Sequence, residues 1–310
     1  MRKLIPLATF FCLLLISGTE FPIKHDITVE KLDNGLTILY WYVPSSPAIA
    51  VRGYVLTGSM YEGEKHLGDG ISHYTEHIVS NGTTTRRSEE EYQSLKRILG
   101  GDQNAYTSND ETCYHITTTP EHFYLADSLI YEWLNECTFK KEEVERERGV
   151  ITQEIRKNQE EVWSLLYDFY KATLFHSYPY SVPVIGYIDN FLTITREELI
   201  DYYNERYHPG ATIISVAGPL PPDSVISHIT ELWKDVPRGN YMPPNFNNPP
   251  LLASRIERTK EYPGQTAYLR FGYRTVPLGH PDMYPLDIAS WVLGGYDQAR
   301  LNRVLKDELG

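Results

Sequence analysis

The sequence has few cysteines and a shortage of positive charge. Its 310 residues include three cysteines, and Cys12 lies in an apolar N-terminal run, which leaves Cys113 and Cys137. Two cysteines without a Cys-x-x-Cys spacing exclude a disulfide framework and a cysteine-based metal site. One Cys113–Cys137 bond and two free thiols both remain open. The net charge of −12 repels phosphate backbones, so no nucleic acid is expected as a partner.

The N-terminal apolar run is too short to span a bilayer comfortably. Met1-Arg2-Lys3 precedes LIPLATFFCLLLISG, whereas a spanning helix needs about 20 apolar residues. A basic head, a short apolar run and small residues after it are typical of a cleaved secretory signal, which we assign to residues 1–19. A retained membrane anchor is the alternative, and a lipoprotein is disfavoured because Cys12 lies inside the run. We expect an exported, periplasmic or extracellular protein with no membrane span after processing.

The sequence also has neither a Gly-x-Ser-x-Gly elbow nor a Gly-rich phosphate loop. It has instead a His-x-x-Glu-His pattern at residues 73–77. If residues 71–80 are helical, His73 and His77 lie one turn apart on one face, with Glu76 on the adjoining flank. Two imidazoles can bind one Zn²⁺, which needs one more protein ligand and an open position for water. Glu76 is then free to take a proton from that water.

A further metal ligand has to come from a distant segment. Glu147 and Glu154 lie in ERERGVITQEIRKNQEE, a charged helical run in which positions seven apart return to the same face. One of them can bind a metal while the other lies behind it. The alternative is a solvated face of i,i+4 ion pairs, which is where most glutamates of such a run belong.

Taken together, these residues resemble the inverted-motif zinc metallopeptidases, the family of pitrilysin, insulin-degrading enzyme and the beta subunit of mitochondrial processing peptidase. That family has a Glu about 76 residues after His-x-x-Glu-His and another Glu seven residues earlier. Here 76 residues separate His77 from Glu154, and Glu147 lies seven before Glu154. GDGISHYTEHIVSNGTTTR and GGDQNAYTSNDETCYH are also similar to family sequences, although Ser72 replaces the usual Ala. The similarity runs from about residue 28 to the end.

The resemblance implies a role for each residue of the site. His73, His77 and Glu154 bind one Zn²⁺, Glu76 is the general base, and Glu147 lies behind a ligand and orients it or neutralises charge. The implied activity is that of a zinc-dependent endopeptidase that hydrolyses extended peptides.

The resemblance also implies a substrate-binding strand. In the family, the strand that holds the equivalents of Asn104, Ala105 and Thr107 borders the cleft and pairs its main chain with the peptide. The small side chain of Ala105 suits close approach of another backbone. Without the resemblance these residues would be an ordinary edge strand with Asn104 in a turn. The other histidines are expected on the surface or in the core, although His115 could approach the site from its strand.

The expected fold class is α+β, with an antiparallel sheet packed against helices in one complete lobe and the truncated start of a second, similar lobe. Residues 27–58 are expected to form three strands, with Asp33-Asn34-Gly35 as a hairpin turn. Capping boxes at Ser88 and Thr195 predict the starts of two helices. Further strands are expected in NAYT, ETCYHITTT and ATIISVAG, and further helices over 120–136, 140–175 and 221–233.

Four segments are expected along the chain: the signal 1–19, a zinc-peptidase lobe 27–235, a Pro- and Asn-rich linker 236–252, and the start of the second lobe 253–310. In the last segment, QTAYLRFGYRTVP is expected as a strand and DMYPLDIASWVLGG as a helix. The family normally continues well past this point, so we expect a fragment whose cleft is completed by a second lobe or a second subunit.

A second functional hypothesis is a non-catalytic peptide-binding subunit, because some relatives have lost their metal ligands. The intact ligand set argues against it, and the truncation argues for it. A structural zinc site is disfavoured because closed structural sites favour Cys-rich tetrahedra, whereas two His and one Glu beside a free carboxylate are a catalytic set.

Overall fold

The computed structural model describes residues 27–176, 178–247, 249–250 and 252–310. The signal predicted over residues 1–19 lies outside this part of the chain. Within it, no helix combines the length and the apolar character needed to cross a membrane.

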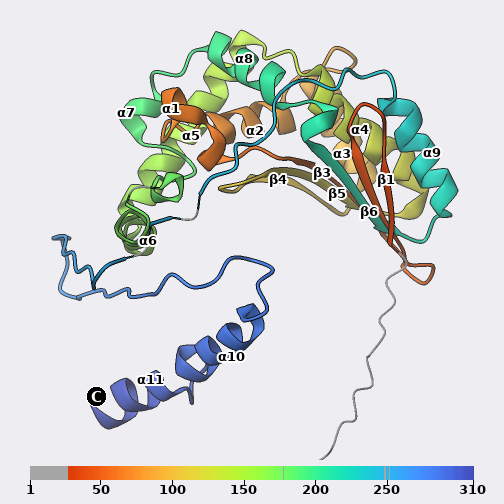
Figure 1. The fold of residues 1–310 in the computed structure, drawn as a ribbon. Helices are drawn as coiled ribbons and strands as arrows, with labels where there is room; N and C mark the ends of the chain where they lie inside the picture. Colours follow the sequence, from red (N-terminus) through yellow and green to blue (C-terminus); the bar gives the residue numbers. More distant parts are fainter. Residues whose placement is uncertain (1–26, 177, 248, 251) are drawn as a thin grey trace, which may run out of the picture.

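A single six-stranded sheet organises the fold, in the order β1-β2-β6-β3-β5-β4 (Figure 1). The strands are β1 (Ile27–Lys31), β2 (Thr37–Tyr42), β3 (Ile49–Val55), β4 (Asp102–Thr107), β5 (Thr112–Thr118) and β6 (Thr212–Gly218). The three strands expected over 27–58 are present, and the turn at Asn34 is held by its side chain, which donates to the carbonyls of Trp233 and Val236. The predicted α+β class is therefore confirmed.

The prediction of a purely antiparallel sheet was wrong in one pair, because β6 runs parallel to β2 while it runs antiparallel to β3. β6 follows β5 only after a long helical excursion and then inserts between β2 and β3. A crossover of this length lets a strand enter a sheet in the parallel direction, whereas the tight β1–β2 hairpin has to be antiparallel. The sequence pattern of β6 carries no signal for its neighbour, so this pairing was missed.

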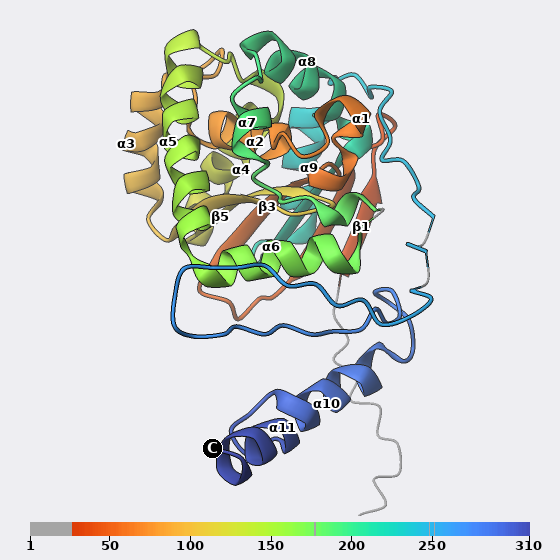
Figure 2. The same cartoon turned by 90° about the vertical axis from the view of Figure 1, so that its left-hand side faces the viewer.

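Helices cover one face of the sheet (Figures 1 and 2). α2, α4 and α9 contact the strands, while α5 and α8 pack on α2. The longer helices are α2 (Ile71–Asn81), α3 (Glu89–Leu99), α4 (Phe123–Glu136), α5 (Lys141–Glu160), α6 (Val162–Leu174), α8 (Arg196–Arg206), α9 (Pro222–Trp233) and α10 (Met283–Gly294). The shorter ones are α1 (Gly63–His66), α7 (Ile188–Phe191) and α11 (Arg300–Asn302), with 3₁₀ turns η1 (Ser59–Tyr61), η2 (Pro120–His122), η3 (Pro179–Ser181) and η4 (Pro209–Ala211) and a π-helical turn η5 (Arg303–Glu308).

Alternation along the strands separates the two faces of the sheet. In β3, Ile49, Val51 and Val55 are buried against the helices, whereas Arg52 and Tyr54 on the opposite face are half-exposed. This period of two is what a sheet with one covered face requires. The second face is thus free of a packed helical layer over the central strands.

Local sequence signals set several helix boundaries. Both predicted capping boxes form: Ser88 with Glu91 begins α3, and Thr195 with Glu198 begins α8. α3 ends at Gly100 and Gly101, both of which have positive φ, and the chain turns there into β4. That turn places β4 at the edge of the sheet beside α2.

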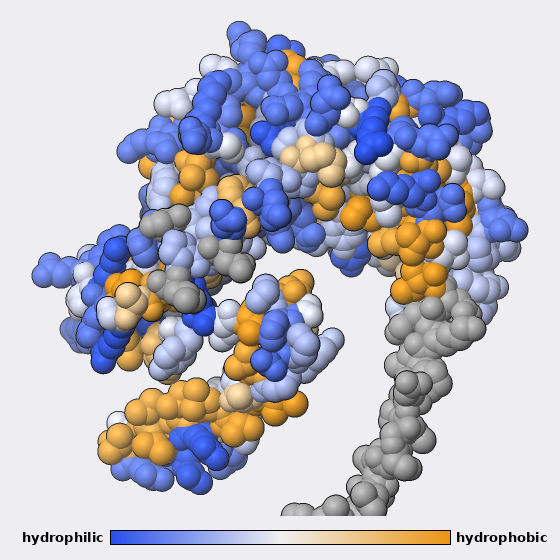
Figure 3. Space-filling view, in the orientation of Figure 1, coloured by the Kyte–Doolittle hydropathy of each residue, from blue (hydrophilic) through white to orange (hydrophobic). Residues whose placement is uncertain are grey.

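The strand expected over residues 265–277 does not form. A strand needs a neighbour to pair its backbone groups, and no strand of the described residues lies beside this segment. The expected helix over 282–295 is present as α10, but large apolar side chains such as Ile288 and Trp291 remain exposed on it. Figure 3 shows apolar residues gathered on these C-terminal helices.

We predict that Gly101→Ala destabilises the fold. Gly101 has φ +69°, and an added Cβ would overlap the carbonyl oxygen of Thr117. A strained non-glycine conformation costs about 1–3 kcal/mol, to which the overlap adds. Thermal unfolding should show a clear drop in Tm. Gly149→Ala is the matched control, because nothing lies within 4 Å of its Cβ and it is inside α5. That change should raise stability by about 0.5–1 kcal/mol.

Candidate active site

The His-x-x-Glu-His segment lies on α2, which is held in place from several sides. Ser72 donates its backbone N–H to Glu62 Oε1 at 3.0 Å, and its hydroxyl lies 2.8 Å from the Tyr202 hydroxyl. The departure from the usual Ala at position 72 therefore adds a hydrogen bond to α8. Tyr74 is buried on the opposite side of the helix and donates to the Val144 carbonyl of α5 at 2.5 Å.

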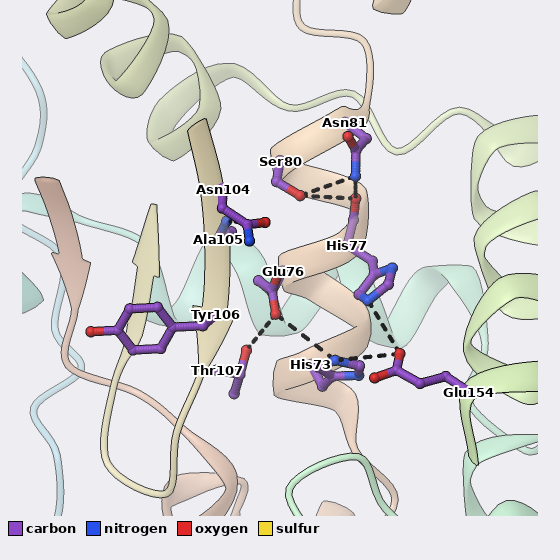
Figure 4. A pocket seen from close by; sticks show the side chains of 10 residues that line it. All are labelled: His73, Glu76, His77, Ser80, Asn81, Asn104, Ala105, Tyr106, Thr107 and Glu154. Atoms are coloured by element: carbon purple, nitrogen blue, oxygen red, sulfur yellow. Dashed lines mark hydrogen bonds and ion pairs between the residues drawn. The ribbon is translucent and has the colours of Figure 1, made fainter. Parts of the chain in front are cut away.

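This packing brings Glu154 of α5 to the two histidines of α2 (Figure 4). Glu154 Oε2 lies 4.0 Å from His73 Nε2 and 3.8 Å from His77 Nε2. One ligand atom from each residue lies within 4.8 Å of the other two. The three groups thus surround one point from two separate helices.

The arrangement can hold a zinc ion. Zinc bonds of about 2.0–2.1 Å place tetrahedral ligand atoms about 3.3–3.4 Å apart, slightly closer than the distances found here. A contraction of a few tenths of an ångström in each side chain would therefore close the site. Two imidazoles and one carboxylate are also a donor set that catalytic zinc uses, with a fourth position open.

Glu147 lies behind His77 rather than in front of it. Its Oε2 is 3.2 Å from His77 Nδ1, and its Oε1 accepts from Arg146 Nε at 3.3 Å. Arg146 in turn donates to Glu89 Oε1 at 2.9 Å, at the first turn of α3. A carboxylate on Nδ1 fixes the imidazole tautomer that leaves Nε2 free for a metal. For His73, no acceptor among the described residues reaches the buried Nδ1.

Glu76 is buried at the edge of the same cluster. One of its oxygens accepts from the Thr107 hydroxyl at 3.1 Å and lies 4.0 Å from His73 Nε2. The carboxyl group is thus oriented by β4 while it faces the metal-binding atoms. It remains separate from the group of three that share one point.

Burial and neighbouring charges set the protonation of these groups. Burial, helped by His77, lowers the pKa of His73 to about 3, so that its imidazole is neutral and can act as a ligand. Burial raises the pKa of Glu76 to about 7, although His77 and Thr107 oppose this shift. Burial lowers the pKa of His77, but its carboxylate neighbours, led by Glu147, outweigh burial and raise it. A cation at this point would replace that proton.

These residues line a pocket of about 310 Å³ between α2, α5 and β4. Asn104, Ala105 and Thr107 line its β4 side, as Figure 4 shows. β4 is an edge strand, and the Ala105 N–H donates to the Asn104 side chain instead of to β5. An edge with outward N–H groups can pair with an added strand.

Three further lining residues were missed by the sequence analysis: Ser80, Asn81 and Tyr106. Ser80 and Asn81 follow His77 by three and four residues, so helical spacing alone could have placed them beside it. His115 lies instead 3.5 Å from Asp102 and is not in the group of three. Cys113 and Cys137 are both free thiols.

Two sequence profiles of one peptidase family match the chain. The profile described as insulinase (peptidase family M16) covers residues 37–187, and the one described as peptidase M16 inactive domain covers residues 193–310. An uncharacterized zinc protease of Rickettsia felis is 26% identical over 292 residues, covering 93% of this chain and 68% of the relative.

Solved structures show the same fold. A protease from Helicobacter pylori has a TM-score of 0.67 at 23% identity, over 71% of this chain and 53% of that one. The first half of the periplasmic protease PqqL from Escherichia coli has a TM-score of 0.63 at 26% identity, over 70% of this chain and 48% of that one. The chain thus spans about two thirds of the Rickettsia relative and about half of these two structures. Together with the profiles, these similarities show that the chain belongs to the insulinase, or M16, family of peptidases.

Proposed function

We propose that the chain carries the zinc site of an endopeptidase that hydrolyses extended peptides. The observation that supports this most directly is the convergence of His73, His77 and Glu154 on one point, with the Glu76 carboxyl group beside it. Zinc bound there would supply Lewis-acid chemistry, polarising the scissile carbonyl and making water easier to deprotonate. Zinc proteases among the family relatives are consistent with the proposal.

Each side chain has a distinct part in the proposed reaction. Glu76 takes a proton from the attacking water and returns it to the departing amine. Its raised pKa, about 7 before a metal binds, lies close to the pH at which both transfers have to occur. Thr107 orients that carboxyl group by donating to one of its oxygens.

The peptide is proposed to bind as an added strand along β4, at Asn104, Ala105 and Thr107. This placement puts its main chain along the pocket wall that faces Glu76. A second lobe or a second subunit is proposed to complete the cleft, since the chain spans only part of its relatives. We also propose an exported location, consistent with the periplasmic PqqL of Escherichia coli.

A non-catalytic peptide-binding subunit is the second candidate, favoured by the partial coverage of the relatives. One assay separates the two. An extended, unstructured peptide is incubated with the chain alone, with added zinc, and with zinc plus chelator. Cleavage that depends on zinc supports the peptidase, whereas binding without cleavage under all three conditions supports the subunit.

Removing a proposed ligand should release the metal. His73→Ala or Glu154→Ala is expected to lower zinc content after dialysis from one ion per chain to well below one, because two ligands hold zinc much more weakly than three. Metal analysis by mass spectrometry measures this. Glu142→Ala is the control, since Glu142 is exposed in the first turn of the same helix. Equal zinc content in all four proteins would contradict the ligand assignment.

Glu147→Gln should weaken zinc binding without abolishing it. The amide keeps the shape of the side chain but removes the charge that holds the His77 ring, and such partners are worth about 10–100-fold in metal affinity. Competition with a zinc-binding dye gives the dissociation constant. An unchanged constant would show that Glu147 has no influence on the site.

Glu76→Gln should separate binding from chemistry. The amide cannot accept a proton, so hydrolysis should fall by about 10²–10⁴-fold. Zinc content should remain that of the unchanged chain, because Glu76 is not among the three proposed ligands. Peptide cleavage followed by mass spectrometry, with metal analysis on the same sample, tests both statements. Full turnover in the variant would refute the role of Glu76.

A further inference from the structure

One end of the pocket, beyond His77, is lined by polar side chains that no step of the proposed reaction uses. Ser80 and Asn81 come from the last turn of α2, and Asn104 faces them from β4 (Figure 4). The Asn81 amide nitrogen donates to the His77 carbonyl at 3.3 Å and to Ser80 Oγ at 3.2 Å. Its orientation is therefore fixed, with the amide oxygen directed to another partner.

That partner is the ammonium group of Lys96 on α3. Its Nζ lies 3.3 Å from both Asn81 Oδ1 and the Ser80 carbonyl, and 5.6 Å from the centre of the Trp133 ring. An ammonium group has three N–H donors, and these two bonds account for two of them. A positive charge is thus held directly behind the polar end of the pocket.

Lys96 is partly buried, and its surroundings keep that charge in place. Burial lowers the pKa of the ammonium group, and Glu89 on the same helix raises it in part. Glu89 also bonds to Arg146 at 2.9 Å, so its charge is shared. Glu76 and Glu154 lie at the other end of the pocket, beside the proposed zinc site, where a divalent cation would offset them.

We propose that Ser80, Asn81, Asn104 and Lys96 form a subsite for an acidic side chain of the substrate, at the residue next to the scissile bond that lies over the last turn of α2. The proposal rests on the proposed peptidase function and deepens it. The Oδ1 atom of Asn104 accepts from Ala105, which leaves its NH₂ group to donate to a carboxylate. Lys96 adds a charge-assisted partner.

Other side chains fit this end of the pocket less well. An apolar side chain would exclude water from the amide and ammonium groups without replacing their hydrogen bonds, which is costly. A basic side chain would face Lys96 with a like charge. A carboxamide keeps the hydrogen bonds but lacks the charge, so it should rank between a carboxylate and an apolar group.

The test uses the zinc-loaded chain and matched peptides. These carry Glu, Gln, Leu or Lys at each of the two residues that flank the scissile bond, and mass spectrometry maps the cleavage position. At one of the two positions, kcat/KM should favour Glu over Leu by about tenfold, the effect of one charge-assisted hydrogen bond. Lys96→Met should reduce this ratio to near one at the same position. Its aliphatic side chain preserves the packing on Trp133, which an unchanged Tm would verify.

Arg97→Met is the matched control. It removes the same charge from the next residue of α3, but Arg97 is exposed and donates to Ser94 Oγ. Its Glu-to-Leu ratio should equal that of the unchanged chain. Asn81→Asp is a second variant, which places a carboxylate against Lys96 and should also remove the preference. Equal cleavage of Glu and Leu peptides, or a preference that survives Lys96→Met, would overturn the subsite while leaving the peptidase proposal intact.

Absence of cleavage for every peptide would instead count against the peptidase proposal. Peptide binding then tests the subsite by itself. Fluorescence anisotropy with the zinc-loaded Glu76→Gln chain should give a Kd about tenfold lower for the Glu peptide than for the Leu peptide. Lys96→Met in that background should make the two constants equal. Equal constants before the Lys96 change would overturn the subsite.

Discussion

The contact between α2 and α5 is the constraint on which the candidate site depends. Each helix alone carries an incomplete set: α2 has His73, His77 and Glu76, while α5 has Glu147 and Glu154. The bond from the Tyr74 hydroxyl to the Val144 carbonyl, with the buried side chains around it, fixes how the two helices face each other. The stability of this packed face therefore contributes to any metal affinity of the site, because a preformed set of ligands loses less entropy on binding.

The same contact explains why two glutamates seven residues apart differ so much. Glu147 is buried, bonds His77 and Arg146, and has a lowered pKa because these partners outweigh its burial. Glu154, two turns further along α5, is less buried and lies at the open pocket beside both histidines. One face of one helix thus offers a carboxylate that orients a ring and a carboxylate that can reach a cation.

Much of this could be predicted from the sequence, because the decisive signals are local. The helix over the His-x-x-Glu-His segment, the capping boxes at Ser88 and Thr195, and the hairpin at Asn34 follow from short patterns, and all of them are present. The residues predicted to bind a metal are brought together, although their role as ligands stays a prediction. The parallel β2–β6 pair was missed because a strand's neighbour depends on the path of the whole chain. The strand expected at 265–277 failed because its apolar pattern requires a partner strand. Lys96 escaped notice because its contact with Asn81 joins two helices and follows no spacing rule.

The central claim is that two imidazoles and one carboxylate hold zinc on this lobe. X-ray absorption at the zinc edge of the chain loaded with one equivalent of zinc tests it most directly. The account predicts a first shell of nitrogen and oxygen atoms at about 2.0–2.1 Å, with the outer scattering of two imidazole rings. A sulfur shell at about 2.3 Å, or a shell without imidazole scattering, would contradict it.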